Sequence, residues 1–62
     1  MAAIKRQNYR PGDIVKVDGK KATVVSLVFS EAVGLCAVDA AVWTDGASVI
    51  ENNVALHRVT PA

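Results

Sequence analysis

Residues 13–29, Asp-Ile-Val-Lys-Val-Asp-Gly-Lys-Lys-Ala-Thr-Val-Val-Ser-Leu-Val-Phe, decide the fold class. Within residues 13–17 the side chains alternate, with Val15 and Val17 on one face, as a half-buried strand requires. Asp18-Gly19 follows at once, and both residues tolerate the positive φ that a type I′ turn needs. The stretch therefore predicts a β-hairpin.

The second strand of this hairpin is expected over residues 22–29, which are rich in β-branched side chains. Strict alternation sends one set to one face and Val24 and Val28 to the other; the first set is Val25, Leu27 and Phe29. Both faces are apolar, so we expect one to line the core and the other to be a candidate interface.

Alternation resumes after an expected loop at residues 30–34. Over residues 35–43 it places Asp39 and Trp43 on one side and an apolar set on the other: Cys36, Val38, Ala40 and Val42. Four alanines between residues 31 and 42 favour a rival helix there. The two-residue period and Gly34 favour the strand.

Two further elements complete the expected fold. Asp45-Gly46 predicts a second tight turn into a strand over residues 47–51, which Asn52-Asn53 should end. The apolar residues at 54, 56 and 59 suit a single 3₁₀ turn whose Leu56 plugs the core before a short last strand. The sequence thus predicts an all-β, five-stranded closed barrel over residues 10–62, preceded by a flexible basic arm at residues 1–9.

The size and composition of the chain indicate a partner. A chain of 62 residues buries only about 60% of the surface that its unfolded form exposes. Cys36 is the only cysteine and His57 the only histidine, so neither an intrachain disulfide nor a zinc cluster is available. With 52% hydrophobic residues, we expect some apolar surface to meet another chain, as a homo-oligomer or in a larger assembly.

The distribution of charges and the length of the apolar runs limit the partners and the cellular location that can be expected. The formal net charge is only +1, but the cations are concentrated in the first third of the chain. No apolar run is long enough to cross a bilayer, and no signal-peptide core is evident, so we expect a cytoplasmic protein without membrane insertion.

The order of Pro11-Gly12-Asp13, the strands, and the closing segment at residues 52–59 resembles the SH3-like barrels of bacterial, plastid and phage proteins. That closing segment, Asn-Asn-Val-Ala-Leu-His-Arg-Val, is similar to the end of photosystem I reaction centre subunit IV, an accessory subunit that helps ferredoxin to dock. The chain has residues 18–21, Asp-Gly-Lys-Lys, where that family has an aromatic cluster. The resemblance implies an SH3-like barrel with an accessory role.

A second resemblance, in the Gly-Asp opening and in Ser48-Val49, is to the type II dihydrofolate reductases, which act as tetramers around one pore. Their pore signature is Val-Gln-Ile-Tyr, whereas residues 49–52 of this chain are Val-Ile-Glu-Asn. The glutamine and tyrosine that hold folate and nicotinamide are absent, so a pore-type reductase is the least favoured alternative.

The residues that could carry chemistry do not form a catalytic set. His57 lies beside an apolar residue with no nucleophile or orienting carboxylate nearby in sequence. Cys36 lacks the flanking cations that would lower its pKa and is expected to be a small buried hydrophobe. We therefore predict no enzyme activity, no metal and no cofactor.

Two sets of residues remain as candidate partner-binding sites. Asp39 and Trp43 share one strand face, and this pairing favours a protein interface, with Trp43 equally consistent with a place in the core. The alternative is a nucleic-acid contact through a basic patch formed by Arg10, Lys16, Lys20 and Lys21. The leading prediction is a non-enzymatic interaction module or accessory subunit.

Overall fold

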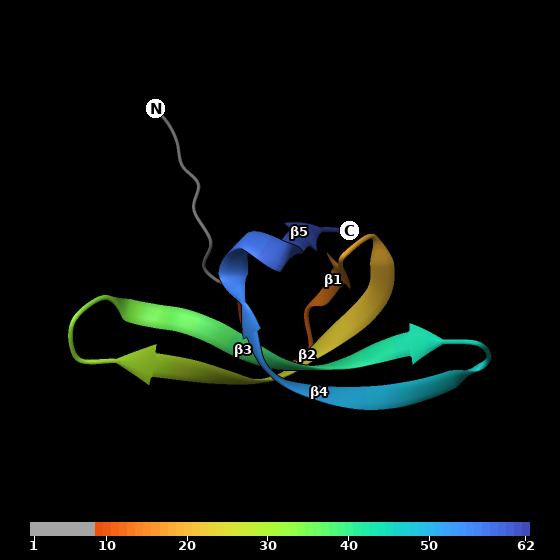
Figure 1. Ribbon diagram of the computed structural model, residues 1–62, viewed down its shortest axis with the longest axis horizontal. Helices are drawn as coiled ribbons and strands as arrows, with labels where there is room; N and C mark the ends of the chain where they lie inside the picture. Colours follow the sequence, from red (N-terminus) through yellow and green to blue (C-terminus); the bar gives the residue numbers. More distant parts are fainter. Residues whose placement is uncertain (1–8) are drawn as a thin grey trace.

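Residues 9–62 form one antiparallel five-stranded sheet, as seen in a computed structural model that describes this part of the chain (Figure 1). The strand order is β4-β3-β2-β1-β5. The elements are β1 (Ile14–Val17), β2 (Lys20–Ser30), β3 (Gly34–Thr44), β4 (Ala47–Ala55), the 3₁₀ turn η1 (Leu56–Arg58) and β5 (Val59–Pro61). The all-β class is confirmed, and the rival helix over residues 31–42 is wrong. Apart from Tyr9, the predicted arm at residues 1–9 lies outside the described residues.

Both predicted tight turns are present. Asp18 and Gly19 have φ values of 52° and 83°, and Asp45 and Gly46 have 51° and 80°. Two successive residues with positive φ are what a type I′ hairpin requires, because its twist matches that of the strands. Figure 1 shows the β2–β3 and β3–β4 hairpins extending in opposite directions, with β3 common to both.

The core consists of small side chains. Its buried members are all valine or alanine, and the largest fully buried side chains are all valines. Tyr9, Leu27 and Leu56 pack against this cluster while remaining partly exposed. Leu56 thus occupies the predicted plugging position in η1. The core cluster comprises Val15, Val17, Ala22, Val24, Val38, Ala40, Val42, Val54 and Val59.

Two predictions about the strands are wrong, and both errors come from β-bulges around Asp39. In β2, Val25 is an extra residue between Val24 and Ser26, so Leu27 returns to the core side and does not share a face with Val25. In β4, residues 52–53 do not end the strand. They form a second bulge opposite Asp39, and β4 continues to Ala55.

The sheet curls over the core but is not closed. Within the described residues no ladder joins β4 to β5, so the predicted closed barrel is not confirmed. The two edges differ in length: β5 has three residues and β4 has nine. The described part of the chain also contains no helix with the length and apolar character needed to cross a bilayer.

Candidate interaction surface

The outer face of the sheet, opposite the valine core, carries a row of uncharged side chains. The backbone register aligns Ile14 with Thr23, Thr23 with Ala41, and Ala41 with Ile50, so each of β1 to β4 contributes one residue to the row. Ile14 is 50% exposed and Ile50 is 55% exposed. The two isoleucines at the ends of the row are thus left half in water, while Thr23 and Ala41 between them are partly buried.

Trp43 lies beside this row on β3, opposite Ser48 of β4. Its exposed fraction is 53%, so it belongs to the surface and not to the core. An open hollow of about 210 Å³ lies next to it. We call the combined surface the Trp43 face; it consists of Ile14, Lys21, Thr23, Ala41, Trp43, Ser48 and Ile50.

The hollow is formed because the side chains around Trp43 are short. Thr23 and Ala41 contribute to its lining, and Ser48 lies on the strand beyond. A large indole next to small residues leaves a concave surface with an apolar wall, which is the shape into which a partner side chain can insert. Lys21 lies at the border and supplies a positive charge.

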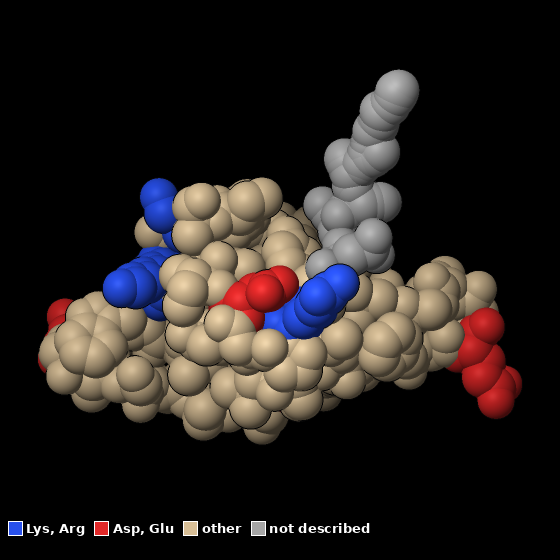
Figure 2. All heavy atoms as spheres, turned by 180° about the vertical axis from the view of Figure 1, so that it is seen from behind, with Lys and Arg blue, Asp and Glu red and all other residues tan. Residues whose placement is uncertain are grey.

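The four predicted basic residues are not brought together. Lys16 and Lys21 are opposite each other on the outer face of β1 and β2. Lys20 instead lines a second hollow, of about 280 Å³, on the inner side of the sheet, together with Asp18. Arg10 precedes β1 and its backbone N–H donates to Asp13 Oδ2 at 2.9 Å. Figure 2 shows the cations of one side of the molecule in two separate groups, one of them next to an acidic side chain.

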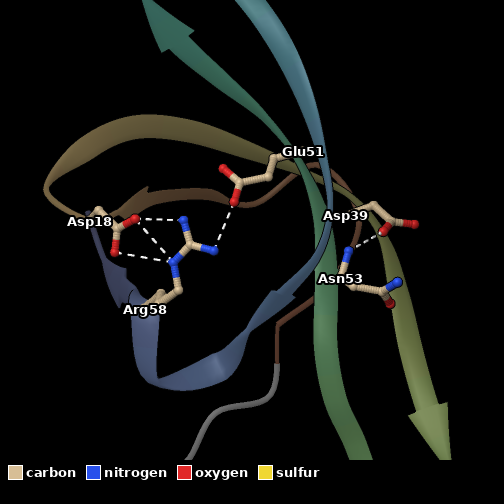
Figure 3. A network of polar contacts seen from close by, with 5 residues as sticks. All are labelled: Asp18, Asp39, Glu51, Asn53 and Arg58. Atoms are coloured by element: carbon tan, nitrogen blue, oxygen red, sulfur yellow. Dashed lines mark hydrogen bonds and ion pairs between the residues drawn. The ribbon is translucent and has the colours of Figure 1, made fainter.

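Asp39 lies on the outer face, but its carboxylate is used within the chain. Oδ2 accepts a hydrogen bond of 2.7 Å from Ser26 Oγ. Oδ1 accepts one of 3.0 Å from the backbone N–H of Asn53 (Figure 3). The Asn53 bond, and then the Ser26 bond, lower the pKa of Asp39. Asn53 has a φ of 56°. Asp39 therefore holds the bulges of β2 and β4 in place, and its role in partner binding stays a prediction.

A second polar network, around Arg58, was not foreseen from the sequence. Arg58 Nη2 lies 2.6 Å from Asp18 Oδ2, and its Nη1 lies 2.8 Å from Glu51 Oε2 (Figure 3). Asp18 belongs to the β1–β2 turn and Glu51 to β4, so Arg58 of η1 links this turn to β4. The Arg58 hydrogen bonds lower the pKa of Asp18, and Asp18, then Glu51, raise the pKa of Arg58.

The groups with potential reactivity lie apart from the Trp43 face. His57 is exposed on η1. Cys36 is partly buried on β3 and its Sγ donates to the backbone carbonyl of Val28 at 3.5 Å. Among residues 9–62, no three His, Cys, Asp or Glu side chains gather as metal ligands. No protein-family model, curated protein or solved structure matches the chain.

Proposed function

We propose that this chain is a non-enzymatic protein-interaction module, an accessory subunit whose Trp43 face binds a protein partner. The observation that carries the proposal is the gathering of Trp43, Ile14 and Ile50, each at least half exposed, on one face of the sheet. Tryptophan is among the residues that most often dominate interface energetics, and the open hollow beside Trp43 offers a place for a partner side chain.

The charges around this face define the kind of partner. Lys16 and Lys21 lie at the same end of the sheet as Trp43. Asp39, the acidic residue on the same face of β3, has both oxygens occupied by Ser26 and Asn53. A partner that inserts an apolar side chain next to Trp43 and presents carboxylates to the two lysines matches this surface.

We further propose that the sheet is an open form of the SH3-like barrel. The support is its connectivity: a 3₁₀ turn leads into a short β5, which pairs with β1, and β4 is left at the other edge. An SH3-like fold is compatible with an accessory role. The argument for that role comes from the Trp43 face, because a fold alone does not determine a function.

The nucleic-acid alternative has less support from the geometry. It requires cations on one continuous surface with aromatic side chains for stacking. Lys20 lies on the other side of the sheet from the pair formed by Lys16 and Lys21, and Arg10 precedes β1. Fluorescence anisotropy with labelled single- and double-stranded DNA and RNA tests it, since a true complex at low salt must weaken steeply as salt rises.

The main test uses Trp43 itself, because it is the only tryptophan of the chain. Candidate partners are recovered by affinity capture, and the purified pair is then titrated while Trp43 fluorescence is recorded. Docking on this face should shift the emission to shorter wavelength, and Trp43→Ala should lose the partner. The control is Phe29→Ala, because Phe29 is 64% exposed and lies near the other end of β3. Equal capture by both variants would contradict the proposal.

A further inference from the structure

Several stretches of strand in the sheet have one side without a neighbouring strand. They differ in how well they are protected against pairing with another chain. An unpaired strand edge is a template for pairing with another chain, and proteins protect such edges with short strands, proline, charges or bulges. The β5 edge is three residues long and ends at Pro61. The free part of β2, beyond its pairing with β1, contains register shifts at Val24/Ser26 and Val28/Phe29. Both are therefore protected.

The first part of β4 carries none of these protections. Residues 47–50, Ala-Ser-Val-Ile, have no charge and no proline, and all four are exposed. Their pairing with β3 is regular from Ala47 to Glu51, and the register shift comes only afterwards. This stretch is a regular, uncharged edge with backbone groups available along its free side.

The geometry of the hairpin determines which backbone groups are free. In a hairpin closed by a two-residue turn, the residues that flank the turn form a hydrogen-bonded pair, and bonded pairs then alternate with non-bonded ones. Thr44–Ala47 and Val42–Val49 are the bonded positions of the β3–β4 register. The N–H and C=O groups of Ser48 and Ile50 consequently point away from β3, toward the free side.

We infer that this β4 edge pairs with the β4 edge of a second copy of the chain, antiparallel about a two-fold axis near Val49, and forms one continuous sheet. Such an arrangement is self-complementary, as a two-fold interface must be. It places the uncharged stretch against itself and sets Glu51 opposite an uncharged residue of the other copy, with no like charges opposed.

A second copy also supplies what this small domain lacks. The core holds only valines and alanines, the chain has a single cysteine, and no metal-ligand cluster occurs within residues 9–62. Edge pairing would bring together the Val49 side chains on one face and the Ile50 side chains on the other, each now 55% exposed. The added burial favours a second copy over an unrelated peptide strand. Ser48 and Ile50 belong to both the β4 edge and the Trp43 face, so edge pairing would place two Trp43 faces side by side.

The test is sedimentation velocity over a concentration series on the full chain. Ser48→Pro removes an N–H that points to the free side and leaves the β3 ladder intact, whereas the matched control Ser48→Ala keeps that N–H. Val49→Lys places two cations against each other at the two-fold axis without changing the Trp43 face. We expect wild type and Ser48→Ala to dimerise, and Ser48→Pro and Val49→Lys to sediment as monomers with unchanged circular dichroism.

Hydrogen exchange supplies a readout that does not depend on any variant. In the wild-type chain the amide protons of Ser48 and Ile50 should become protected as concentration rises, while a dimer formed through the Trp43 face alone would leave them in exchange with water. A wild-type chain that stays monomeric at every concentration overturns the inference. So does an association that survives both Ser48→Pro and Val49→Lys but is lost in Trp43→Ala.

Discussion

Replacing Trp43 with alanine should remove partner binding while leaving a folded domain. An aromatic side chain buries roughly 150–250 Å² when it is fully enclosed. With 53% of Trp43 exposed, about 100 Å² is out of water, which is worth about 2.5 kcal/mol at about 25 cal/mol per Å². Because the unfolded chain also hides part of this area, the cost falls to about 1.5–2 kcal/mol.

That cost can be compared with the stability of the whole domain. A chain of 62 residues is expected to have roughly 3–9 kcal/mol of unfolding free energy, at about 0.05–0.15 kcal/mol per residue. Trp43→Ala should therefore unfold at a lower urea concentration but remain folded in buffer. At the interface, loss of a dominant tryptophan costs roughly 2 kcal/mol or more, or about a 30-fold increase in Kd.

Two measurements on the same variant separate these effects. Urea unfolding followed by circular dichroism gives the change in stability, and titration with the captured partner gives the change in Kd. A loss of more than about 3 kcal/mol in stability, as for a fully buried aromatic residue, with an unchanged Kd for the molecules that remain folded, would refute the assignment of Trp43 to an interface.

Three further predictions concern the fold. Val38→Ala, at a position that is 0% exposed, should cost about 2–3 kcal/mol in urea unfolding, and a cost near zero would contradict the assigned core. The pKa of Asp39 is lowered, first by the Asn53 N–H. The ionised carboxylate therefore stabilises the fold above the ordinary carboxyl pKa, and this stabilisation is lost as pH falls through the lowered pKa of the folded state. Thermal unfolding across that pH range should depend less on pH in Asp39→Asn than in wild type, and equal pH profiles would count against this bond. Arg58→Lys should lower the urea midpoint at low salt, because lysine cannot reproduce the paired contacts with Asp18. The difference from wild type should shrink at high salt. An unchanged urea midpoint at low salt would show that the network does not contribute to stability.

Local signals were sufficient to predict the strands and both tight turns. The Asp-Gly pairs at residues 18–19 and 45–46 take the positive φ values expected of them, because this requirement depends on adjacent residues only. The alternation of residues 35–43 likewise put Val38 and Trp43 on opposite faces. It left open whether Trp43 belongs to the core, and the structure shows Val38 buried and Trp43 exposed. Where the register has no bulge, successive residues in the sequence lie on opposite faces of the sheet.

The errors arose where a residue depends on partners far away in sequence. In the sequence Val25 continues an alternating strand. In the structure it is the extra residue of a bulge next to the hydrogen bond between Ser26 and Asp39, which are 13 positions apart. Asn53 was expected to end its strand because asparagine accepts positive φ. It does adopt that conformation, but its N–H binds Asp39 and the strand continues.

The ion pairs of Arg58 could not be predicted from the sequence for a similar reason. Arg58 and Asp18 are 40 positions apart, and no spacing rule relates a residue of the last turn to one of the first. The one available signal was Glu51, a charge at an alternating position whose β3 partner, Ala40, is fully buried. A carboxylate on the inner side of a sheet needs a cationic or hydrogen-bonding partner, and Arg58 is that partner.

The irregular part of the sheet is centred on Asp39, and the free β4 edge lies outside it. Bulges increase strand twist and bend, and those of β2 and β4 lie on either side of this residue, where the sheet folds over the valine core. Toward the Asp45 turn, β3 and β4 pair without interruption. This end of the sheet has no bulge, and Trp43, Val49 and Ile50 are exposed there. Removing the Asp39 bonds should therefore disturb the core first and change the Trp43 face and the β4 edge only through loss of the fold.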